Sequence, residues 1–211
     1  GNKLNNNNNN NITNDKDNTI DNTNDDKNSF NDLISPFIKS LEENNFDPTF
    51  SDLEFVERKE YTIKCNWKVF IDNFCDGGYH VPFAHKDLNS TLDLTSYKSE
   101  IYKKCSIQVV GGKENDRIGK SAVYCYLYPN IMFNRYGPWL DINVVIPISE
   151  TECIVIIEWF IEKNLTKDKK FIEESLKSSE LVQMEDVMLC ENVIKGIKSD
   201  AYDKGRYVPS K

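Results

Sequence analysis

Histidine is scarce in this sequence, which has only 2 among 211 residues. The 6 cysteines are dispersed and form no Cys-x-x-Cys pair, so their spacing favours neither a zinc knuckle nor a disulfide framework. Most of them lie in apolar or alternating segments, where a free cysteine behaves as a small hydrophobic residue. We therefore predict reduced core thiols in a reducing compartment. They are Cys65, Cys75, Cys105, Cys125, Cys153 and Cys190.

Long apolar runs and an excess of positive charge are also missing. No segment approaches the roughly 20 apolar residues that span a bilayer, and the N-terminus has no apolar signal segment. The formal net charge is -8, which argues against a groove of Lys and Arg that follows phosphate groups. We expect an intracellular protein, cytoplasmic or organellar, that binds neither a membrane nor nucleic acid.

Residues 1–29 consist largely of Asn and Asp. They offer too little apolar surface to offset the entropy lost on ordering, so we predict a disordered tail. Residues 30–211 form the predicted domain, and hydrophobic residues make up 39% of the chain, enough for one core. The chain begins with Gly rather than Met, which indicates a trimmed or partial product.

The middle of the domain predicts an antiparallel sheet, after a short amphipathic segment that Pro36 interrupts. Residues 46–68 match a loop that leads into a strand, and residues 95–110 and 121–137 match further strands. Two apolar segments around the polar break 149–152 predict a hairpin. Within 121–137, alternate residues divide between two faces. Val123, Cys125 and Leu127 share one face, and Tyr124, Tyr126 and Tyr128 share the other.

A single long helix is predicted from about Asp168 to Lys198. With Ile172 at zero and 100° per residue, an apolar stripe lies within about 80° on either side. Asp186 falls inside this stripe at about −40°, whereas Glu185, at about −140°, faces away. A carboxylate in an apolar stripe is costly unless a partner holds it. The stripe contains Leu176, Val182, Val187, Cys190, Val193, Ile194 and Ile197.

Both histidines lie in the segment NFCDGGYHVPFAH. Two imidazoles and one carboxylate on one side of a metal form the facial triad of non-haem Fe(II) oxygenases, and His80, His85 and Asp186 offer such a set. On an unbroken helix the two imidazoles would point about 140° apart. We expect Pro82 to kink the segment by a clash with the carbonyl group of Gly78, while the glycine pair tolerates unusual dihedral angles. From spacing alone, hydrogen-bonded histidines and a buried structural Asp remain open alternatives.

Two long segments resemble one protein family. The first is CNWKVFIDNFCDGGYHVPFAHKDL, which is similar to the start of the catalytic domain in alpha subunits of Rieske-type non-haem iron ring-hydroxylating oxygenases, most closely their choline-oxidising members of glycine betaine synthesis. The second is VQMEDVMLCENVIKGIKSDAYDKGRYVPS, which is similar to their C-terminal helix and tail, so the resemblance covers roughly residues 55–211. It implies a helix-grip, START-like α+β fold, an antiparallel sheet packed on a long C-terminal helix. It also implies that His80, His85 and Asp186 bind a mononuclear Fe(II) ion.

The resemblance makes two further residues candidates for catalytic roles. Asn73 matches an Asn that precedes the ligands in the family, and a capping or structural role is as open as a direct one. In many members, a carboxylate three residues before the first histidine connects the iron site to the 2Fe–2S Rieske cluster of the neighbouring subunit. Here Gly77 occupies that position and Asp76 lies one residue earlier, still about one helical turn from His80. Asp76 can therefore serve this role, with a solvated capping carboxylate as the alternative.

The electron-receiving 2Fe–2S Rieske cluster of this family is held by two cysteines and two histidines. This chain has no histidine besides His80 and His85. We therefore expect a catalytic-domain fragment or a divergent half-protein without a Rieske domain. A missing domain or a partner chain would then supply the cluster, and a reductase or ferredoxin would supply its electrons. The resemblance also implies a homo-oligomer, namely a trimer.

The activity implied is hydroxylation of a small substrate with O2 and two electrons, with choline converted to betaine aldehyde. An aromatic cage would suit such a quaternary ammonium ion, although aromatic residues in strands also occur simply as core. Two alternatives stay open: the same machinery acting on another betaine or an aromatic ring, and a non-enzymatic helix-grip domain that binds an apolar or cationic ligand. The candidate cage residues are Tyr124, Tyr126, Tyr128, Phe133, Tyr136, Trp139 and Trp159.

Overall fold

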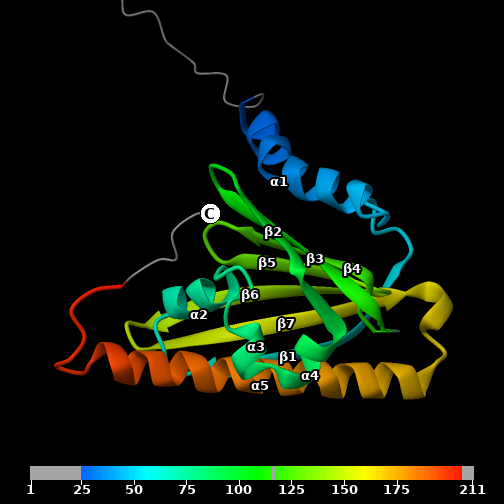
Figure 1. Ribbon diagram of the computed structural model, residues 1–211. Helices are drawn as coiled ribbons and strands as arrows, with labels where there is room; N and C mark the ends of the chain where they lie inside the picture. Colours follow the sequence, from blue (N-terminus) through cyan, green and yellow to red (C-terminus); the bar gives the residue numbers. More distant parts are fainter. Residues whose placement is uncertain (1–24, 116, 206–211) are drawn as a thin grey trace, which may run out of the picture.

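A seven-stranded antiparallel sheet occupies the centre of the computed structural model, which describes residues 25–115 and 117–205 (Figure 1). The strand order is β1-β7-β6-β5-β4-β3-β2, so consecutive strands are neighbours except that β1 pairs with β7. Every neighbouring pair is antiparallel, as predicted. The strands are β1 (Leu53–Ile63), β2 (Leu92–Ile101), β3 (Cys105–Asn115), β4 (Gly119–Leu127), β5 (Ile131–Tyr136), β6 (Trp139–Ser149) and β7 (Glu152–Glu162).

Helices cover both faces of the sheet (Figure 1). They are α1 (Asp25–Glu43), α2 (Trp67–Phe74), α3 (Val81–Ala84), α4 (Lys86–Thr91), the 3-10 helix η1 (Lys163–Leu165) and α5 (Lys169–Ile197). The long helix α5 crosses one face, beside the short helices α2 to α4, and α1 packs against the other. Asp168 caps α5 by accepting a hydrogen bond from the backbone N–H of Phe171 at 3.0 Å. The sheet and its long C-terminal helix confirm the predicted helix-grip α+β fold.

The structure divides each of two predicted strands in two. Residues 95–110 contain the end of β2 and the start of β3, which are joined where the N–H of Tyr102 donates to the carbonyl of Cys105 at 2.8 Å. Residues 121–137 contain β4 and β5, which reverse around Pro129. Apolar and polar residues keep alternating through such turns, so periodicity alone does not show where the chain turns back. The predicted hairpin of β6 and β7 is confirmed.

Helix α1 starts inside the segment that composition predicts to be disordered. It begins at Asp25, so residues 25–29 are helical. Residues 1–24 of the predicted tail lie outside the described part of the chain. The helix also continues through Pro36, where the sequence predicts an interruption.

Burial of one face explains why α1 continues past Pro36. Phe37 and Leu41 are fully buried, and the ring of Phe37 stacks on Phe133 of β5 with 5.3 Å between centroids. Burying a large apolar side chain contributes about 1.5–3 kcal/mol, so the two together offset the roughly 3 kcal/mol that a proline inside a helix costs. The same cluster includes Val123, Cys125 and Leu127, the face of β4 that alternation predicts.

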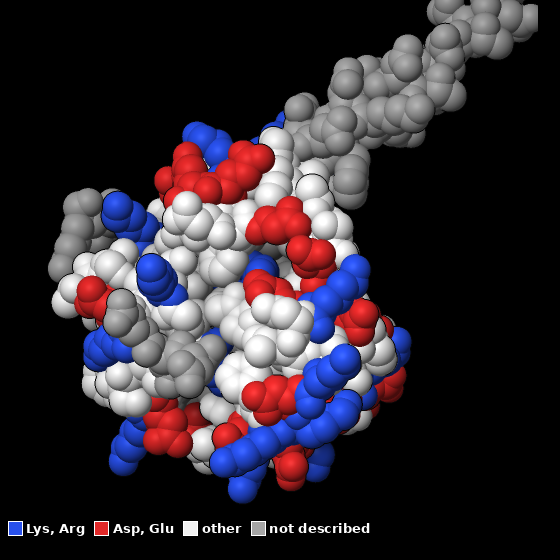
Figure 2. Space-filling model, turned by 90° about the vertical axis from the view of Figure 1, so that its right-hand side faces the viewer, with Lys and Arg blue, Asp and Glu red and all other residues white. Residues whose placement is uncertain are grey.

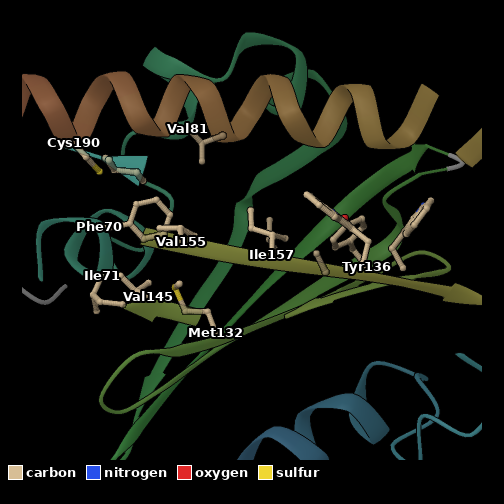
Figure 3. Close-up of a cluster of buried hydrophobic side chains, with 14 of the residues drawn as sticks. Phe70, Ile71, Val81, Met132, Tyr136, Val145, Val155, Ile157 and Cys190 are labelled. Atoms are coloured by element: carbon tan, nitrogen blue, oxygen red, sulfur yellow. The ribbon is translucent and has the colours of Figure 1, made fainter. Parts of the chain in front are cut away.

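The larger core lies between α5 and the sheet (Figure 3). Phe70 of α2 and Ile157 of β7 both point into this layer. Tyr124 and Tyr126 pack against it, as predicted for the second face of β4, whereas Tyr128 is 60% exposed beyond the end of the strand. All six cysteines are free and five are buried, which confirms the prediction of core thiols.

The apolar stripe of α5 is buried over only part of its length. Cys190 is 1% exposed, but Val193 and Ile197 are 47% and 42% exposed. Both residues lie in the last two turns of α5, which ends at Ile197. The stripe is visible in the sequence, whereas the point where its partner surface ends is not.

The surface view in Figure 2 shows acidic and basic side chains interspersed over one face of the molecule. This face lacks the one-sided basic character that is typical of nucleic-acid binding. Among the described residues, no helix is both long enough and apolar enough to cross a membrane.

Candidate metal centre and adjoining cavity

Both histidines lie at the ends of the one-turn helix α3. Before it, Gly77 and Gly78 adopt left-handed backbone conformations, with φ angles of 78° and 74°, as predicted for the glycine pair. A Cβ atom at Gly78 would also lie 2.6 Å from the ring of Tyr97. Backbone conformation and available space therefore both require glycine at position 78.

Pro82 does not kink a helix, contrary to the prediction. It lies in the first turn of α3, where its missing N–H has no helical partner to lose. The break falls instead at His85, whose φ and ψ angles of -110° and 74° end α3 just before α4 begins. The two imidazoles consequently meet, and their Nε2 atoms are 3.0 Å apart.

Asp186 of α5 completes a triangle of three ligand-type atoms with His80 and His85, called the triangle below. Its Oδ1 lies 3.1 Å from Nε2 of His85 and 3.5 Å from Nε2 of His80. The side chain of His85 is 1% exposed, against 20% for His80 and 17% for Asp186. The structure thus brings together, in a partly enclosed site, the three residues that the sequence nominates.

The other nitrogen of each imidazole contacts a carboxylate. Nδ1 of His80 lies 2.7 Å from Oδ2 of Asp76, and Nδ1 of His85 lies 2.7 Å from Oε2 of Glu185. A carboxylate at this distance accepts the N–H of Nδ1, which leaves the lone pair of Nε2 directed into the triangle. Burial lowers the pKa of His85, but its hydrogen bonds and charge interactions with Asp186 and Glu185 outweigh burial and raise the pKa above its ordinary value.

Glu185 is a site residue that the helical wheel misses. The wheel places Glu185 at about −140°, outside the apolar stripe, and Asp186 at about −40°. Both angles fall on the same flank of α5, so an imidazole packed along that flank reaches both carboxylates. The contact depends on His85, which lies 100 residues earlier in the chain, and the sequence pattern of the helix carries no sign of it.

Asn73 and Asp76 both contact the triangle. Asn73 lies on α2, and its Nδ2 donates to Oδ1 of Asp186 at 2.7 Å, so the amide holds this carboxylate in place. Asp76 accepts the backbone N–H groups of Tyr79 and His80 at 3.0 Å each. Because it also contacts the His80 ring, Asp76 both caps the turn and orients an imidazole.

Two adjoining cavities extend from the triangle toward the sheet. The first, of about 140 Å³, is lined by all three residues of the triangle, and the second, of about 120 Å³, is lined by Asp186 alone of the three. The two cavities share further lining residues, among them Phe74, Tyr124 and Asn134. A cavity of about 150 Å³ holds a molecule the size of benzene, so this space suits a small ligand.

The cavities use only part of the predicted aromatic cage. Tyr124, Tyr136 and Trp159 line the second cavity. Phe133 packs against α1 instead, because residues adjacent in a strand point to opposite faces and Phe133 follows the inward-facing Met132. The candidates that line neither cavity are Tyr126, Tyr128, Phe133 and Trp139.

Asp141 of β6, like Glu185, is a site residue that the sequence pattern did not lead us to predict. It is 7% exposed and lines the second cavity. Asn134 and Asn143 donate side-chain N–H groups to its Oδ1, and the hydroxyl of Tyr136 donates to its Oδ2 at 3.0 Å. Burial raises the pKa of Asp141 to about 6 against the effect of these hydrogen bonds. An acidic residue in a largely apolar strand is the sequence signal for such a group.

Sequence comparisons match this chain to one protein family. The family model described as ring hydroxylating alpha subunit (catalytic domain) matches residues 50–115 and 108–211. The chloroplastic choline monooxygenase of Arabidopsis thaliana is 53% identical over 163 residues, which are 74% of this chain and 39% of the relative. The chloroplastic choline monooxygenase of Beta vulgaris is 39% identical over 175 residues, which are 81% of this chain and 39% of the relative. The chain therefore spans well under half the length of these curated relatives.

Solved structures with the same fold include two oxygenases. A quaternary ammonium Rieske monooxygenase, studied for carnitine oxidation and inter-subunit electron transfer, gives a TM-score of 0.69 at 20% identity and covers 82% of this chain and 48% of that chain. A naphthalene 1,2-dioxygenase bound to phenanthrene gives a TM-score of 0.62 at 18% identity and covers 80% of this chain and 48% of that chain. Identities this low establish the fold, and the fold by itself does not define a substrate.

Proposed function

Because the chain belongs to the ring-hydroxylating oxygenase alpha subunits and matches their catalytic domain, we propose that it forms the iron-binding part of a monooxygenase that hydroxylates choline. The observation that carries this proposal is the triangle of His80, His85 and Asp186 beside a small, partly aromatic cavity. The 53% identity to a choline monooxygenase supports choline as the substrate. The size of the cavity favours a small substrate over a multi-ring one.

The donor set of the triangle fits a mononuclear iron ion. Ligands in adjacent positions around a metal, with bonds of about 2.1 Å, lie about 3 Å apart. The three donor atoms are 3.0, 3.1 and 3.5 Å apart. We assign Nε2 of His80, Nε2 of His85 and the carboxylate of Asp186 as the groups that would hold the iron ion. Iron bound there would supply the activation of O2.

In the proposed reaction, the choline carbon that bears the hydroxyl group exchanges a C–H bond for a C–OH bond. The product is the hydrate of betaine aldehyde, and the second oxygen atom of O2 leaves as water after accepting two electrons and two protons. This chain contributes orientation: Asn73 holds Asp186, while Asp76 and Glu185 fix the two imidazoles. Apolar side chains such as Phe70, Phe74 and Leu88 line both cavities, so the surroundings of the reacting carbon would be less polar than bulk water.

The electrons for this reaction need a source outside the triangle. A Rieske cluster takes two histidines, and both histidines of this chain belong to the triangle. We propose a 2Fe–2S cluster on another domain or on a partner chain, supplied by a reductase or ferredoxin, within a homotrimer of intracellular location, cytoplasmic or organellar. The side chain of Asp76 is 27% exposed and contacts His80, which makes it the proposed connection to that cluster.

Choline should bind beside the triangle in the iron-loaded chain. Anaerobic calorimetric titration measures this binding, and we expect one choline per chain. Glycine betaine and benzoate are the comparison ligands, because they represent another betaine and an aromatic ring. Failure to bind choline together with binding of benzoate would move the substrate to the aromatic class and contradict this part of the proposal.

Glu185→Ala should weaken iron binding by about 10- to 100-fold, the usual cost of removing the hydrogen-bond partner of a metal-binding histidine. Without that carboxylate, the Nδ1 atom of His85 no longer favours the tautomer that directs Nε2 to the metal. Competition with a chelator under anaerobic conditions measures the affinity. Glu185→Gln should lose less, since its amide oxygen still accepts the N–H. The control is Glu173→Ala, at an exposed position of the same helix, and equal affinity in this control and in Glu185→Ala would refute the role.

A further inference from the structure

We propose that Asp141 selects a positively charged substrate, with its carboxylate as the counter-ion of a quaternary ammonium group bound in the second cavity. This inference rests on the proposed function, because it places the substrate in the cavities that adjoin the triangle. It adds a specificity-determining residue that the metal site itself does not require. Asp141 is neither a residue of the triangle nor a contact of its imidazoles.

The sheet presents Asp141 in a row of side chains that form one wall of the cavity. Asp141 pairs across the strands with Asn134 of β5 on one side and Trp159 of β7 on the other, and Asn134 in turn pairs with Tyr124 of β4. Directly paired residues project from the same face of an antiparallel sheet. All four line the second cavity, on the face that α5 covers. The carboxylate therefore lies between an amide and an indole at the wall of a small, half-open cavity.

The charge of Asp141 is hydrogen-bonded without being cancelled by its immediate partners. Its three donors, from Asn134, Asn143 and Tyr136, are all neutral. Arg117 lines the same cavity, where its guanidinium donates to Ser179 at 2.6 Å and lies 5.1 Å from the centroid of the Tyr136 ring. Its charge lowers the pKa of Asp141 less than the three hydrogen bonds do. Burial nevertheless dominates and holds the pKa at about 6. A cation in the cavity would offset this cost of ionisation, because charges attract strongly in a medium of low dielectric constant.

Aromatic rings beside Asp141 determine the kind of cation that the cavity suits. Trp159 is 2% exposed and lines the same cavity as Asp141. Tyr136 also lines it, on the sheet beneath α5 (Figure 3), but one face of its ring already contacts the guanidinium of Arg117. A quaternary ammonium ion has no N–H to donate, so a carboxylate and aromatic faces are the groups that recognise it. A primary ammonium would instead need several acceptors within hydrogen-bonding distance.

Asn134 gives the bound substrate a direction. Its Nδ2 donates to Asp141, and its buried Oδ1 has no hydrogen-bond partner within the described residues. Asn134 lines both cavities, so this acceptor lies between the Asp141 end and the triangle. A hydroxyl group that donates to Oδ1 would keep the ammonium at Asp141 and bring the hydroxyl-bearing carbon toward His80, His85 and Asp186.

Two ligands of matched shape test this inference in the iron-loaded, 211-residue chain. They are choline and its uncharged carbon analogue, 3,3-dimethylbutan-1-ol. Anaerobic calorimetry should show that the unaltered chain binds choline at least about 10-fold more tightly than the analogue. Asp141→Asn should lower the affinity for choline about 10- to 100-fold and change the affinity for the analogue by less than about 3-fold. Asp72→Asn, which removes an exposed carboxylate on α2, should change neither affinity. Iron content and circular dichroism check that the Asp141→Asn chain is folded and loaded.

The possible results separate this inference from the proposed function. Equal weakening of both ligands by Asp141→Asn would show that Asp141 only organises its hydrogen-bonded neighbours, and would overturn its role in selection. If the variant does not fold, the unaltered chain still decides: equal affinity for choline and the uncharged analogue would overturn the inference. An unaltered, iron-loaded chain that binds no choline would overturn the choline assignment first, and the role of Asp141 with it.

Discussion

Replacing Asp186 with Ala should lower the iron affinity of this chain by more than about 100-fold, which exceeds the usual loss on removing an outer hydrogen-bond partner. Asp186 supplies the carboxylate oxygen of the triangle, 3.1 Å and 3.5 Å from the two imidazole nitrogens. Its side chain is 17% exposed and polar, so its removal leaves no closed apolar cavity and α5 should keep its fold. Metal analysis after anaerobic loading and desalting measures iron per chain, and circular dichroism measures the helix content.

The two histidine variants provide the matched series. His80→Ala and His85→Ala should each reduce iron content, because each removes one Nε2 ligand. His85 is almost fully buried, so His85→Ala should also lower the melting temperature, more than His80→Ala does. Asp72→Ala, on the exposed side of α2, is the control. Iron loading that stays unchanged in the three ligand variants would show that the triangle is not the metal site.

The iron-loaded chain, supplied with O2 and choline alone, should not turn over repeatedly. Each oxidation consumes two external electrons, and the two histidines of the chain are both committed to the triangle, so none is left to hold a Rieske cluster. Mass spectrometry of betaine aldehyde per chain over time is the measurement. We expect an early plateau rather than a steady rate.

A second chain that carries a Rieske cluster, with its reductase, should restore steady catalysis. Asp76→Asn should then slow the restored rate more than it weakens iron binding, because the amide oxygen still accepts the N–H of His80 while the charged connection is lost. Asp87→Asn, at an exposed position of α4, is the control. Sustained betaine aldehyde formation by the pure chain with only a chemical reductant would mean that no further domain is required, and the half-enzyme hypothesis would have to be abandoned.

Elements with strong periodicity were predictable, and the ends of those elements were not. The division of β4 into an α1-facing side with Val123 and an α5-facing side with Tyr124 follows from alternation alone. The helix from Asp168 onward follows from its apolar stripe. The turn between β2 and β3 depends on a hydrogen bond from Tyr102 to Cys105, and the continuation of α1 through Pro36 depends on the burial of Phe37. Local composition shows neither of these contacts.

A conflict between a residue and its local pattern pointed to Asp186, because a carboxylate there interrupts an apolar helix face. Asp141 carries the same kind of signal in a largely apolar strand, but it was not among the predicted site residues. Glu185 carries none, since an acidic residue on the outer side of a helix is ordinary until His85 packs against it.

The sequence by itself determined that strands are followed by one long helix. It also supplied the two histidines and the carboxylate that a facial metal site needs. Only the tertiary structure decided which nitrogen of each imidazole faces the triangle, because Asp76 and Glu185 must first meet the opposite nitrogens. It also decided which aromatic rings reach the cavity, because lateral strand pairing and the cover of α5 place Tyr124, Tyr136 and Trp159 there. These contacts join residues that are distant along the chain, and a side chain acquires such neighbours only when the strands pair and α5 closes over them.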